Sequence, residues 1–321
     1  MKLVIMASFG IPEVGEKQWQ AVDEAARAAG CTSVIARDTE TQLVEIEDAD
    51  MAFGRVTKEA LARATKLRWV QSVGAGVDAQ LYSEFIEAPV TLTSEKGLVG
   101  THLSEHAFGL LLALTRGINT AIRAKRWDAR IDIRGQAWEL PGRTMGVIGL
   151  GGTGVEVARR AVAFGMDVIA MDPEPVDQPP FVVELWGLDR FHELLRRSDA
   201  VVITCPLAPS SKNMFNAAAF AQMRPHAVLV NVSRGEVVDM EALIDAVRRG
   251  LIAGAGLDVT PIEPLPTDNP LWAMDNVIIT FHTAGASPHR GDRIVDRFRR
   301  NLARFQAGEP LEGVIDKVKG Y

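Results

Sequence analysis

Apolar and polar positions in the first hundred residues follow two alternating patterns. Short apolar runs, with the length of buried strands and flanked by polar or glycine-containing turns, lie at 2–7, 32–36, 49–53 and 68–72. Between the first two runs, residues 16–29 carry apolar side chains at helical spacing. The alternation predicts a small α/β unit, and its last run leads into the glycine-rich loop Gly74-Ala75-Gly76.

The same alternation returns in the second part of the chain. Strand-like runs separated by helical segments lie at 145–149, 167–171, 200–204, 227–231, 253–257 and 277–280. Parallel strands need crossover connections, and helices between them give right-handed crossovers. The pattern therefore predicts a second α/β unit built on a larger parallel sheet.

Two longer helical patterns connect and close these units. One begins near Thr101 and keeps apolar residues at helical spacing as far as Leu114, so it could link two domains, and its apolar length also suits a dimer interface. The other covers 292–305, with an apolar face that we expect to pack on the N-terminal unit. Its opposite face is rich in arginine, which indicates a solvated surface rather than an anion site.

Length and composition fit this organisation. A chain of 321 residues is long enough for two domains, at about 150 residues each. We expect a smaller, discontinuous domain of residues 1–98 and 287–321 and a second domain of residues 99–286. With 47% hydrophobic and 24% charged residues, the chain belongs to the ordinary globular class.

Charge and cysteine usage narrow the partners. The net charge of −6 argues against nucleic acid, since phosphate binding needs clustered excess lysine and arginine, so a small ligand is favoured. The two cysteines, Cys31 and Cys205, have no metal-type spacing and fit buried thiols in a reducing cytoplasm. The apolar run at the N-terminus is too short for a signal peptide, and no apolar run in the sequence is long enough to span a membrane.

A dinucleotide-binding turn follows the strand predicted at 145–149. The string Gly149-Leu150-Gly151-Gly152-Thr153-Gly154 fits GxGxxG, with a buried strand before it and a helix after it. In this motif Gly149 allows the tight turn, Gly151 lets the backbone approach a pyrophosphate, and Gly154 lets helix and strand pack closely. The helix N-terminus adds free N–H groups and the positive end of the helix dipole.

A carboxylate closes the next strand. Asp172 lies 18 residues after Gly154, where it would accept hydrogen bonds from the adenosine ribose hydroxyls and repel a 2′-phosphate. Residues 173–180 contain no lysine or arginine that could neutralise such a phosphate. The sequence therefore favours NAD over NADP, the alternative being a turn aspartate without a ligand.

Three polar residues follow late strands and are candidates for chemistry. Arg234, Glu263 and His282 each lie in a loop after a predicted strand, and in open α/β sheets ligands bind outside the carboxyl ends of strands. A guanidinium matches a carboxylate, an imidazole exchanges protons near neutral pH, and a neighbouring carboxylate orients that imidazole and favours its protonated form. From the residues alone, ordinary surface and loop roles stay open for all three.

Several motifs in order resemble the D-isomer-specific 2-hydroxyacid dehydrogenases. They are GAGVD at Gly74, GLGGTG at Gly149, the stretch from CPLAPSSKNMFN to MRPHAVLVNVSRGEVVD, then AGAGLDV, IEPLP, and HTAG at His282. The resemblance covers most of the chain. It implies a Rossmann-type, doubly wound coenzyme domain and a smaller flavodoxin-like substrate domain, which would close over substrate and cofactor. It also implies a homodimer.

The resemblance assigns roles to the candidates. Arg234 would grip the substrate carboxylate and polarise its 2-oxo group, His282 would donate the proton in reduction, and Glu263 would hydrogen-bond His282. Backbone N–H groups of Gly74, Ala75 and Gly76 would bind the substrate carboxylate. Asp258 would hold the nicotinamide carboxamide, unless it has an ordinary strand-end role, and Thr101 would touch the cofactor or only cap its helix. Further cofactor contacts are implied for Cys205, Pro206, Val232, Ser233 and Gly285.

The expected reaction is reduction of a small 2-oxo acid of the glyoxylate, hydroxypyruvate or pyruvate type. The stretch WVQSVGAGVD looks most like glyoxylate and hydroxypyruvate reductases. Two related reactions are disfavoured by single residues. Formate dehydrogenases, which are similar in the coenzyme domain, have glutamine where this chain has Glu263, and phosphite dehydrogenases have lysine where this chain has Ala75. The alternatives are an NAD(H)-sensing corepressor and an NAD-binding structural subunit. No metal is expected, since His102 and His106 lack an HExxH pattern or an acidic third ligand.

Overall fold

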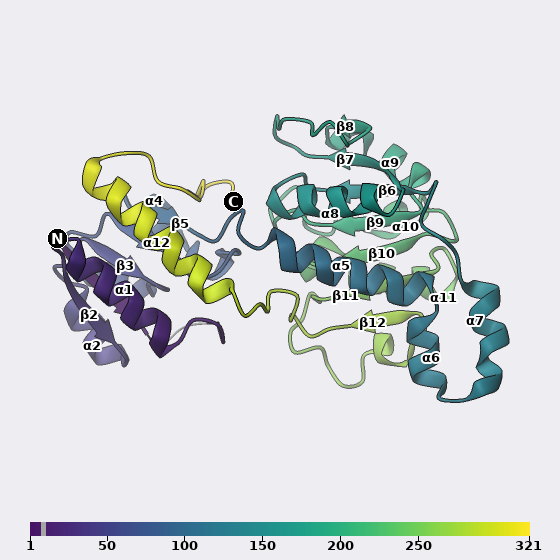
Figure 1. The fold of residues 1–321 in the computed structure, drawn as a ribbon, viewed down its shortest axis with the longest axis horizontal. Helices are drawn as coiled ribbons and strands as arrows, with labels where there is room; N and C mark the ends of the chain where they lie inside the picture. Colours follow the sequence, from purple (N-terminus) through teal and green to yellow (C-terminus); the bar gives the residue numbers. More distant parts are fainter. Residues whose placement is uncertain (8–10) are drawn as a thin grey trace. The chain divides into compact units, whose positions relative to one another are not determined.

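The computed structural model describes residues 1–7 and 11–321, and the chain divides into two compact units. Unit 1 combines residues 1–99 with residues 286–321, and unit 2 is the continuous segment 100–285. In Figure 1, unit 1 contains the purple and yellow ends of the chain, and unit 2 runs from teal to green. The chain thus passes between the units twice, at Val99–Gly100 and at Gly285–Ala286.

Unit 1 is built on five parallel strands in the order β2-β1-β3-β4-β5. The strands are β1 (Lys2–Met6), β2 (Thr32–Ala36), β3 (Met51–Phe53), β4 (Trp69–Gln71) and β5 (Thr91–Thr93). This is the flavodoxin-type strand order. Leu3, Val4 and Ile5 of the near-central strand β1 are all fully buried, because helices cover both faces of the sheet.

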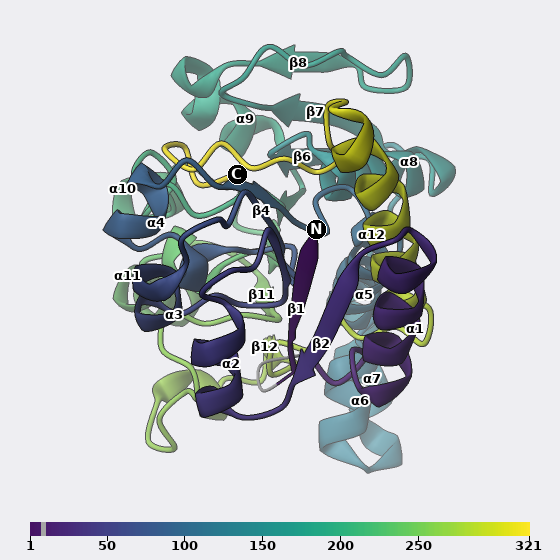
Figure 2. The same cartoon turned by 90° about the vertical axis from the view of Figure 1, so that its left-hand side faces the viewer.

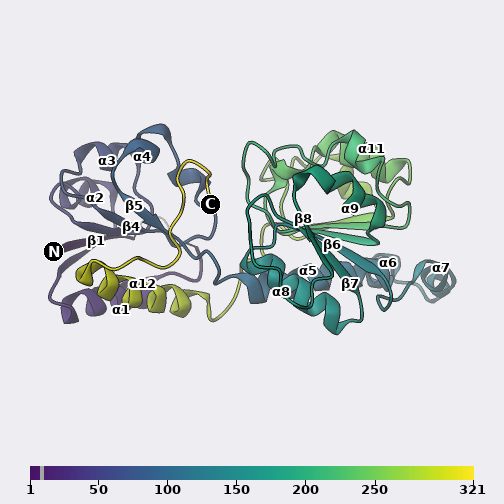
Figure 3. The ribbon, with the colours of Figure 1, turned by 90° about the horizontal axis from the view of Figure 1, so that it is seen from above.

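The helices of unit 1 form a layer on each face of its sheet. They are α1 (Glu16–Ala28), α2 (Thr39–Glu45), α3 (Lys58–Arg63), α4 (Ser83–Glu87) and α12 (Arg290–Ala307). Figure 3 shows α1 and α12 on one face and α2, α3 and α4 on the other. Figure 2 shows α1 and α12 side by side, although they come from opposite ends of the chain.

The C-terminal helix α12 completes the core of unit 1. The ring of Trp69 is fully buried and stacks on Phe298, with centroids 5.5 Å apart and planes at 12°. Phe305 also packs against this indole, with centroids 5.3 Å apart and planes at 39°. Aromatic contacts of this kind add to the stabilisation from apolar burial, so β4 depends on residues more than 200 positions later in the chain.

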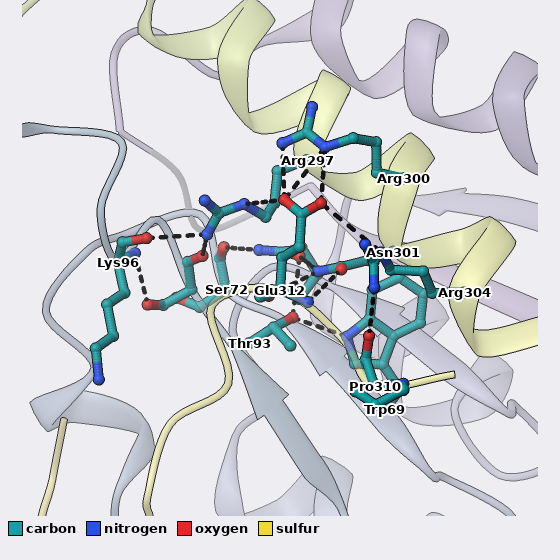
Figure 4. Close-up of polar contacts among 12 residues, drawn as sticks. Trp69, Ser72, Thr93, Lys96, Arg297, Arg300, Asn301, Arg304, Pro310 and Glu312 are labelled. Atoms are coloured by element: carbon teal, nitrogen blue, oxygen red, sulfur yellow. Dashed lines mark hydrogen bonds and ion pairs between the residues drawn. The ribbon is translucent and has the colours of Figure 1, made fainter. Parts of the chain in front are cut away.

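The arginines of α12 do not all face solvent, and that expectation is wrong for Arg297. The residue is 7% exposed, and its Nη1 donates to the carbonyl oxygens of Ser94 at 3.1 Å and Lys96 at 3.0 Å. Its Nε lies 3.4 Å from Glu312 Oε2, and Arg300 and Arg304 approach the same carboxylate (Figure 4). These three arginines therefore meet an anion of their own chain, and burial lowers the pKa of Arg297.

Unit 2 is built on seven parallel strands in the order β8-β7-β6-β9-β10-β11-β12. The strands are β6 (Thr144–Ile148), β7 (Asp167–Met171), β8 (Glu184–Trp186), β9 (Ala200–Ile203), β10 (Val228–Asn231), β11 (Gly254–Leu257) and β12 (Val277–Ile279). The order reverses between β6 and β9, as in the doubly wound Rossmann arrangement. The predicted fold class is confirmed. Two three-residue edge strands, β5 and β8, were not predicted.

The helices of unit 2 also cover both faces of its sheet. They are α5 (Gly100–Thr115), α6 (Ile118–Ala124), α7 (Arg130–Gln136), α8 (Gly152–Ala163), α9 (Phe191–Arg197), α10 (Ala217–Phe220) and α11 (Met240–Arg248). Figure 3 shows α5 and α8 on the face opposite α9 and α11. The apolar side chains of α5, such as Ala107 and Leu111, are buried within unit 2. Leu112 and Leu114 of the same helix pack against the same apolar cluster but are only partly buried, so the dimer-interface role suggested by the apolar length of α5 stays a prediction.

Candidate functional site

Three neighbouring strands of unit 2 carry the candidate chemical residues at their carboxyl ends. Arg234 follows β10, Glu263 follows β11 and His282 follows β12, and these strands are adjacent and parallel in the sheet. Parallel strands place their carboxyl ends at one edge, so three loops far apart in sequence meet there. The structure joins Glu263 to His282 directly and puts Arg234 on the adjoining loop.

The imidazole of His282 is oriented by a carboxylate. Nδ1 of His282 lies 2.8 Å from Oε2 of Glu263, and Oε1 of Glu263 accepts the N–H of Thr260 at 3.0 Å. Because a carboxylate only accepts, the proton of this contact is on Nδ1. No other residue in the described ranges hydrogen-bonds the ring of His282. Its Nε2 is therefore available to exchange a proton with a ligand.

The backbone at His282 has an unusual conformation. Phe281 has φ of +55° and His282 has φ of +58°, the left-handed region that residues other than glycine rarely adopt. Such residues cluster at functional sites, where surrounding bonds hold them. Here the N–H of His282 donates to the carbonyl oxygen of Asp258 at 2.6 Å.

Asp258 is buried beneath this loop. It is 3% exposed, and its carboxylate accepts hydrogen bonds from the hydroxyl of Thr280 at 2.7 Å and from the N–H groups of Thr283 at 2.9 Å and Ala284 at 3.1 Å. Oδ2 has one described donor, the Ala284 N–H, and so keeps capacity for another. The strand-end role weighed from the sequence is thus present, and a further bond to a nicotinamide carboxamide is compatible with it.

The loop that carries Arg234 is shaped by residues that the sequence analysis did not single out. Fully buried Asn231 donates from Nδ2 to the carbonyl oxygen of Arg234 at 2.9 Å and accepts the N–H of Ser233 at 3.0 Å. Nη1 of Arg234 donates to the carbonyl oxygen of Ser233 at 2.8 Å. At Gly235, an added Cβ would overlap the backbone of Thr260, so only glycine lets the Arg234 loop pack on the Glu263 loop.

The glycine turn has the geometry that the motif requires. Gly149 has φ of +92°, and an added Cβ there would lie 2.6 Å from Cys205 Cα. An added Cβ on Gly154 would overlap the carbonyl oxygen of Gly149, whereas one on Gly151 would meet nothing within 4 Å. Gly151 thus borders open space at the start of α8.

The first turn of α8 offers hydrogen-bond donors beside that space. Within the described part of the chain, the N–H groups of Gly152, Thr153 and Gly154 have no acceptor, as the first turn of a helix requires. Donors at a helix N-terminus, next to a backbone without side chains, suit a pyrophosphate. The residues present therefore fit a dinucleotide.

Asp172 is bonded to the same turn. Its Oδ2 accepts the N–H of Leu150 at 2.8 Å, its Oδ1 accepts the N–H of Glu174 at 3.0 Å, and its side chain is only partly buried. The turn role weighed from the sequence is therefore real. A carboxylate has about four lone-pair sites, so further acceptor capacity remains for ribose hydroxyls.

The other implied cofactor residues fall into two groups. Cys205 is buried behind the glycine turn, and burial raises the pKa of its thiol to about 12, so it is an inert core thiol there. The hydroxyl of Ser233 donates to the carbonyl oxygen of Cys205, which ties the loops after β9 and β10 together. Pro206 and Val232 flank these positions. Thr101 lies inside the first turn of α5 rather than before it, so it is not an N-cap.

The predicted substrate loop lies in unit 1, after β4. One of its amides is used internally, since the N–H of Gly74 donates to the hydroxyl of Ser72 at 3.2 Å. The N–H groups of Ala75 and Gly76 have no acceptor among residues 1–7 and 11–321. The loop can therefore offer two backbone donors to an anion.

The base of this loop is held by α12. Asn301, fully buried, donates to Oε1 of Gln71 at 3.2 Å, and Gln71 in turn donates to the carbonyl oxygen of Ser72 at 3.0 Å. Asn301 also exchanges two hydrogen bonds with the backbone of Glu312, at 2.7 and 3.0 Å. Figure 4 shows this connection between α12, the C-terminal segment and β4.

Comparison with known proteins identifies the family. Residues 108–284 match the family described as D-isomer specific 2-hydroxyacid dehydrogenase, NAD binding domain. The chain belongs to this family. A glyoxylate reductase from Korarchaeum cryptofilum is 34% identical over 282 residues, covering 85% of this chain and 84% of that protein. The dehydrogenase is therefore an enzyme acting on CH–OH groups with a nicotinamide dinucleotide.

Solved structures support the same assignment for the whole dehydrogenase. A D-isomer specific 2-hydroxyacid dehydrogenase from Xanthobacter autotrophicus, in complex with NADPH and MES, is 30% identical, with a TM-score of 0.82 over 100% of this chain and 99% of its own. An NADPH-dependent glyoxylate/hydroxypyruvate reductase from Sinorhizobium meliloti is 28% identical, with a TM-score of 0.80 over 100% and 99%.

The described residues contain neither a candidate membrane-spanning helix nor a candidate metal cluster. In the described residues, no helix is both long and apolar enough to cross a membrane. Within the same ranges, no three histidine, cysteine or acidic side chains are grouped so that they could hold a metal ion. His106 instead places Nε2 2.7 Å from the hydroxyl of Thr280.

Proposed function

We propose that this dehydrogenase interconverts a small 2-oxo acid, of the glyoxylate, hydroxypyruvate or pyruvate type, and the matching D-2-hydroxy acid, using NAD(H). The observation that carries the proposal is the 2.8 Å contact between His282 and Glu263 at the strand ends of a dinucleotide-binding fold. Relatives named as glyoxylate and glyoxylate/hydroxypyruvate reductases favour a small substrate.

His282 is the general acid in reduction. With Nδ1 directed at Glu263, a protonated ring presents Nε2–H outward, and that proton goes to the oxygen of the 2-oxo group. When bound, the reduced nicotinamide supplies the hydride that the carbonyl carbon receives. In the reverse direction the neutral ring accepts the hydroxyl proton at Nε2. Glu263 stabilises the cationic ring and keeps it from rotating.

Arg234 and the loop after β4 are proposed to bind the substrate. A guanidinium forms two parallel hydrogen bonds with a carboxylate, and it can also polarise the adjacent oxo group. In unit 1, the N–H groups of Ala75 and Gly76, which have no acceptor among the described residues, would offer donors to a carboxylate. Gly74 contributes by its shape rather than by its N–H, which Ser72 already accepts.

The cofactor is proposed to lie along the strand ends from β7 to β12. Gly151, Gly152, Thr153 and Gly154 would hold the pyrophosphate, and Asp172 the adenosine ribose. Loop residues after β9 to β12 would line the remainder, namely Cys205, Pro206, Val232, Ser233, Asp258 and Gly285, with Thr101 of α5. Asp172 supports NAD over NADP, because its charge opposes a 2′-phosphate.

We also propose that the protein is a homodimer. Exposed apolar side chains gather on the segment from α6 to α7, where Ile122 is 65%, Trp127 87% and Ile131 71% exposed. Side chains of this kind on one projecting segment are typical of an interface. We expect Trp127→Glu to yield monomers in analytical ultracentrifugation, and Val44→Glu, at an exposed apolar position of unit 1, to leave the assembly unchanged.

The enzymatic proposal is tested by steady-state turnover. Oxidation of NADH and NADPH is measured with glyoxylate, hydroxypyruvate, pyruvate and phenylpyruvate, for wild type, His282→Ala and Arg234→Ala. We expect NADH to be preferred, and the His282 variant to lose about 10²- to 10⁴-fold in kcat. Arg234→Ala should raise KM as well as lower kcat.

The outcomes separate the possible functions. Equal rates for wild type and both variants would refute the roles given to His282 and Arg234. Tight NADH binding without turnover of any 2-oxo acid would favour an NAD(H)-sensing protein instead. Arg249→Ala serves as the control, because Arg249 is an exposed arginine paired with Asp245 on α11.

A further inference from the structure

Helix α5 is connected to the histidine loop by a partly buried hydrogen-bond chain that ends on buried Asp258. Nε2 of His106 lies 2.7 Å from Oγ1 of Thr280, and Oγ1 of Thr280 lies 2.7 Å from Oδ1 of Asp258. Nε2 of His106 is also 3.5 Å from the same carboxylate oxygen. Nothing in the reaction proposed above uses His106 or Thr280.

The direction of this chain follows from its chemistry. A carboxylate only accepts hydrogen bonds, so the single proton of the Thr280 hydroxyl is donated to Asp258. The hydroxyl oxygen must then accept from His106, which places a proton on Nε2 of that ring. His106 therefore donates to Thr280, and Thr280 donates to Asp258. The Thr280 hydroxyl links the other two residues, since it accepts one bond and donates the other.

Asp258 passes this constraint on to the loop. The residue accepts the N–H groups of His282, Thr283 and Ala284, so it holds three consecutive amides of the loop. Two residues there, Phe281 and His282, are in the left-handed conformation, which persists only where surrounding bonds impose it. The orientation of Asp258 therefore determines where the imidazole of His282 points.

The location of His106 makes the connection more than local. α5 begins at Gly100, where the chain enters unit 2, and the histidine loop ends at Gly285, where the chain leaves it. The chain from His106 to Asp258 thus ties together the two segments of unit 2 that adjoin the crossings.

We propose that His106 is a positioning residue for 2-oxo acid reduction, acting through Thr280 and Asp258 on the loop that presents His282. It does not contact the reacting atoms. This proposal rests on the proposed function for its kinetic consequence, while its structural consequence, a loop held by α5, is independent of any reaction.

The test compares variants that break and keep the donor. His106→Phe removes the donor to Thr280, Thr280→Val removes the relay at nearly constant volume, and His106→Gln keeps an N–H that can reach the hydroxyl. Glu105→Gln, at the neighbouring exposed position of α5, is the control. Hydrogen–deuterium exchange of residues 281–285 is measured without substrate, together with kcat, KM and the NADH dissociation constant.

We expect exchange in the loop to become at least about fivefold faster in His106→Phe and Thr280→Val, because local opening is easier. We expect kcat to fall roughly 10- to 100-fold, with KM and the NADH constant changed less than about threefold, because a misplaced imidazole affects the chemical step. His106→Gln and Glu105→Gln should stay close to wild type in both measurements.

The results distinguish this proposal from the proposed function. Unchanged loop exchange in both breaking variants would overturn the positioning role, as would a His106→Gln variant no better than His106→Phe. If His106→Phe does not fold, the comparison rests on Thr280→Val and His106→Gln. Faster exchange in a protein whose wild type reduces no 2-oxo acid would remove the proposed function but keep the link from α5 to the loop.

Discussion

Oε2 of Glu263 lies 2.8 Å from Nδ1 of His282, although the two residues come from loops after different strands. Oε1 of the same carboxylate accepts the N–H of Thr260, so Glu263 cannot turn without losing a backbone bond. Because Glu263 is itself fixed, the imidazole of His282 is held in one orientation. This relationship makes the proton-transfer role of His282 testable through its neighbour.

Glu263→Gln keeps an acceptor for Nδ1 but removes the charge that stabilises the protonated ring. We expect kcat in the reduction direction to fall about tenfold, less than the 10²- to 10⁴-fold expected for His282→Ala. The pH dependence of kcat/KM should change for Glu263→Gln. His192→Ala, at an exposed histidine on α9, should have wild-type kinetics. A Glu263→Gln enzyme with an unchanged pH profile would contradict the role of the carboxylate.

Asp172→Ala removes the negative charge from the end of β7. We expect the ratio of kcat/KM for NADH over NADPH to fall at least about tenfold, because the ribose hydroxyls lose an acceptor and a 2′-phosphate is no longer repelled. Asp177→Ala removes an equal charge from an exposed position in the following segment and should leave the ratio unchanged. If both variants behave alike, the preference depends on general charge and not on Asp172.

Gly235→Ala forces the Arg234 loop away from the Thr260 backbone. We expect activity to fall more than about 100-fold while most of the fold is retained, because two site loops separate by a small distance. Gly109→Ala is the matched control, since an added Cβ on that exposed residue of α5 meets nothing within 4 Å. It should stabilise the protein by about 0.5–1 kcal/mol, measured by urea unfolding.

Asp199, at the start of β9, gives unit 2 a pH-dependent stability. Burial by itself raises the pKa of its carboxyl, but hydrogen bonds from His226, from the Thr144 N–H and from Arg224 outweigh burial and hold the pKa below the ordinary value. A depressed pKa in the folded state means that the stabilisation is complete above the unfolded pKa, about 3.9, and is lost as the pH falls through the folded pKa.

The corresponding measurement is the urea midpoint of unit 2 between pH 7 and pH 3. We expect Asp199→Asn to cost about 1–3 kcal/mol at pH 7, because the donors Arg224, His226 and the Thr144 N–H lose a buried charged acceptor. The difference from wild type should shrink below about pH 4. Asp268→Asn, at an exposed aspartate, should follow the wild-type curve throughout. A constant difference at all pH values would show that the titration of Asp199 contributes nothing.

The parts of the fold that could be predicted from sequence are those where a local pattern has a single physical cause. The glycine turn at Gly149 is one, since a strand, a backbone with positive φ and a helix start lie within a few residues. The burial of Arg297 could not be predicted in this way. Its partners Ser94, Lys96 and Glu312 are distant in sequence or on another segment, so its helix alone reads as charged and solvated.

The site shows the same division. His282 and Glu263 lie in loops whose residue types carry chemistry, so they stand out in the sequence. Asn231 and Gly235 had a local signal in their turn-forming residue types, but only the contact with Thr260 explains why glycine is required. His106 looks like any histidine on an amphipathic helix. Its partner Thr280 is 174 residues away, and no spacing rule connects them.

The two crossings between the units have a consequence for synthesis of the protein. Unit 2 is one uninterrupted segment, so all of it is outside the ribosome once residue 285 has emerged. Unit 1 is still incomplete at that point, because Phe298 and Phe305 of α12, which pack on Trp69, have not yet emerged. The first part of the chain to be made is therefore the last to close its core, and the part of the sheet face that α12 covers beside α1 stays exposed until α12 has been made, the kind of surface that chaperones bind.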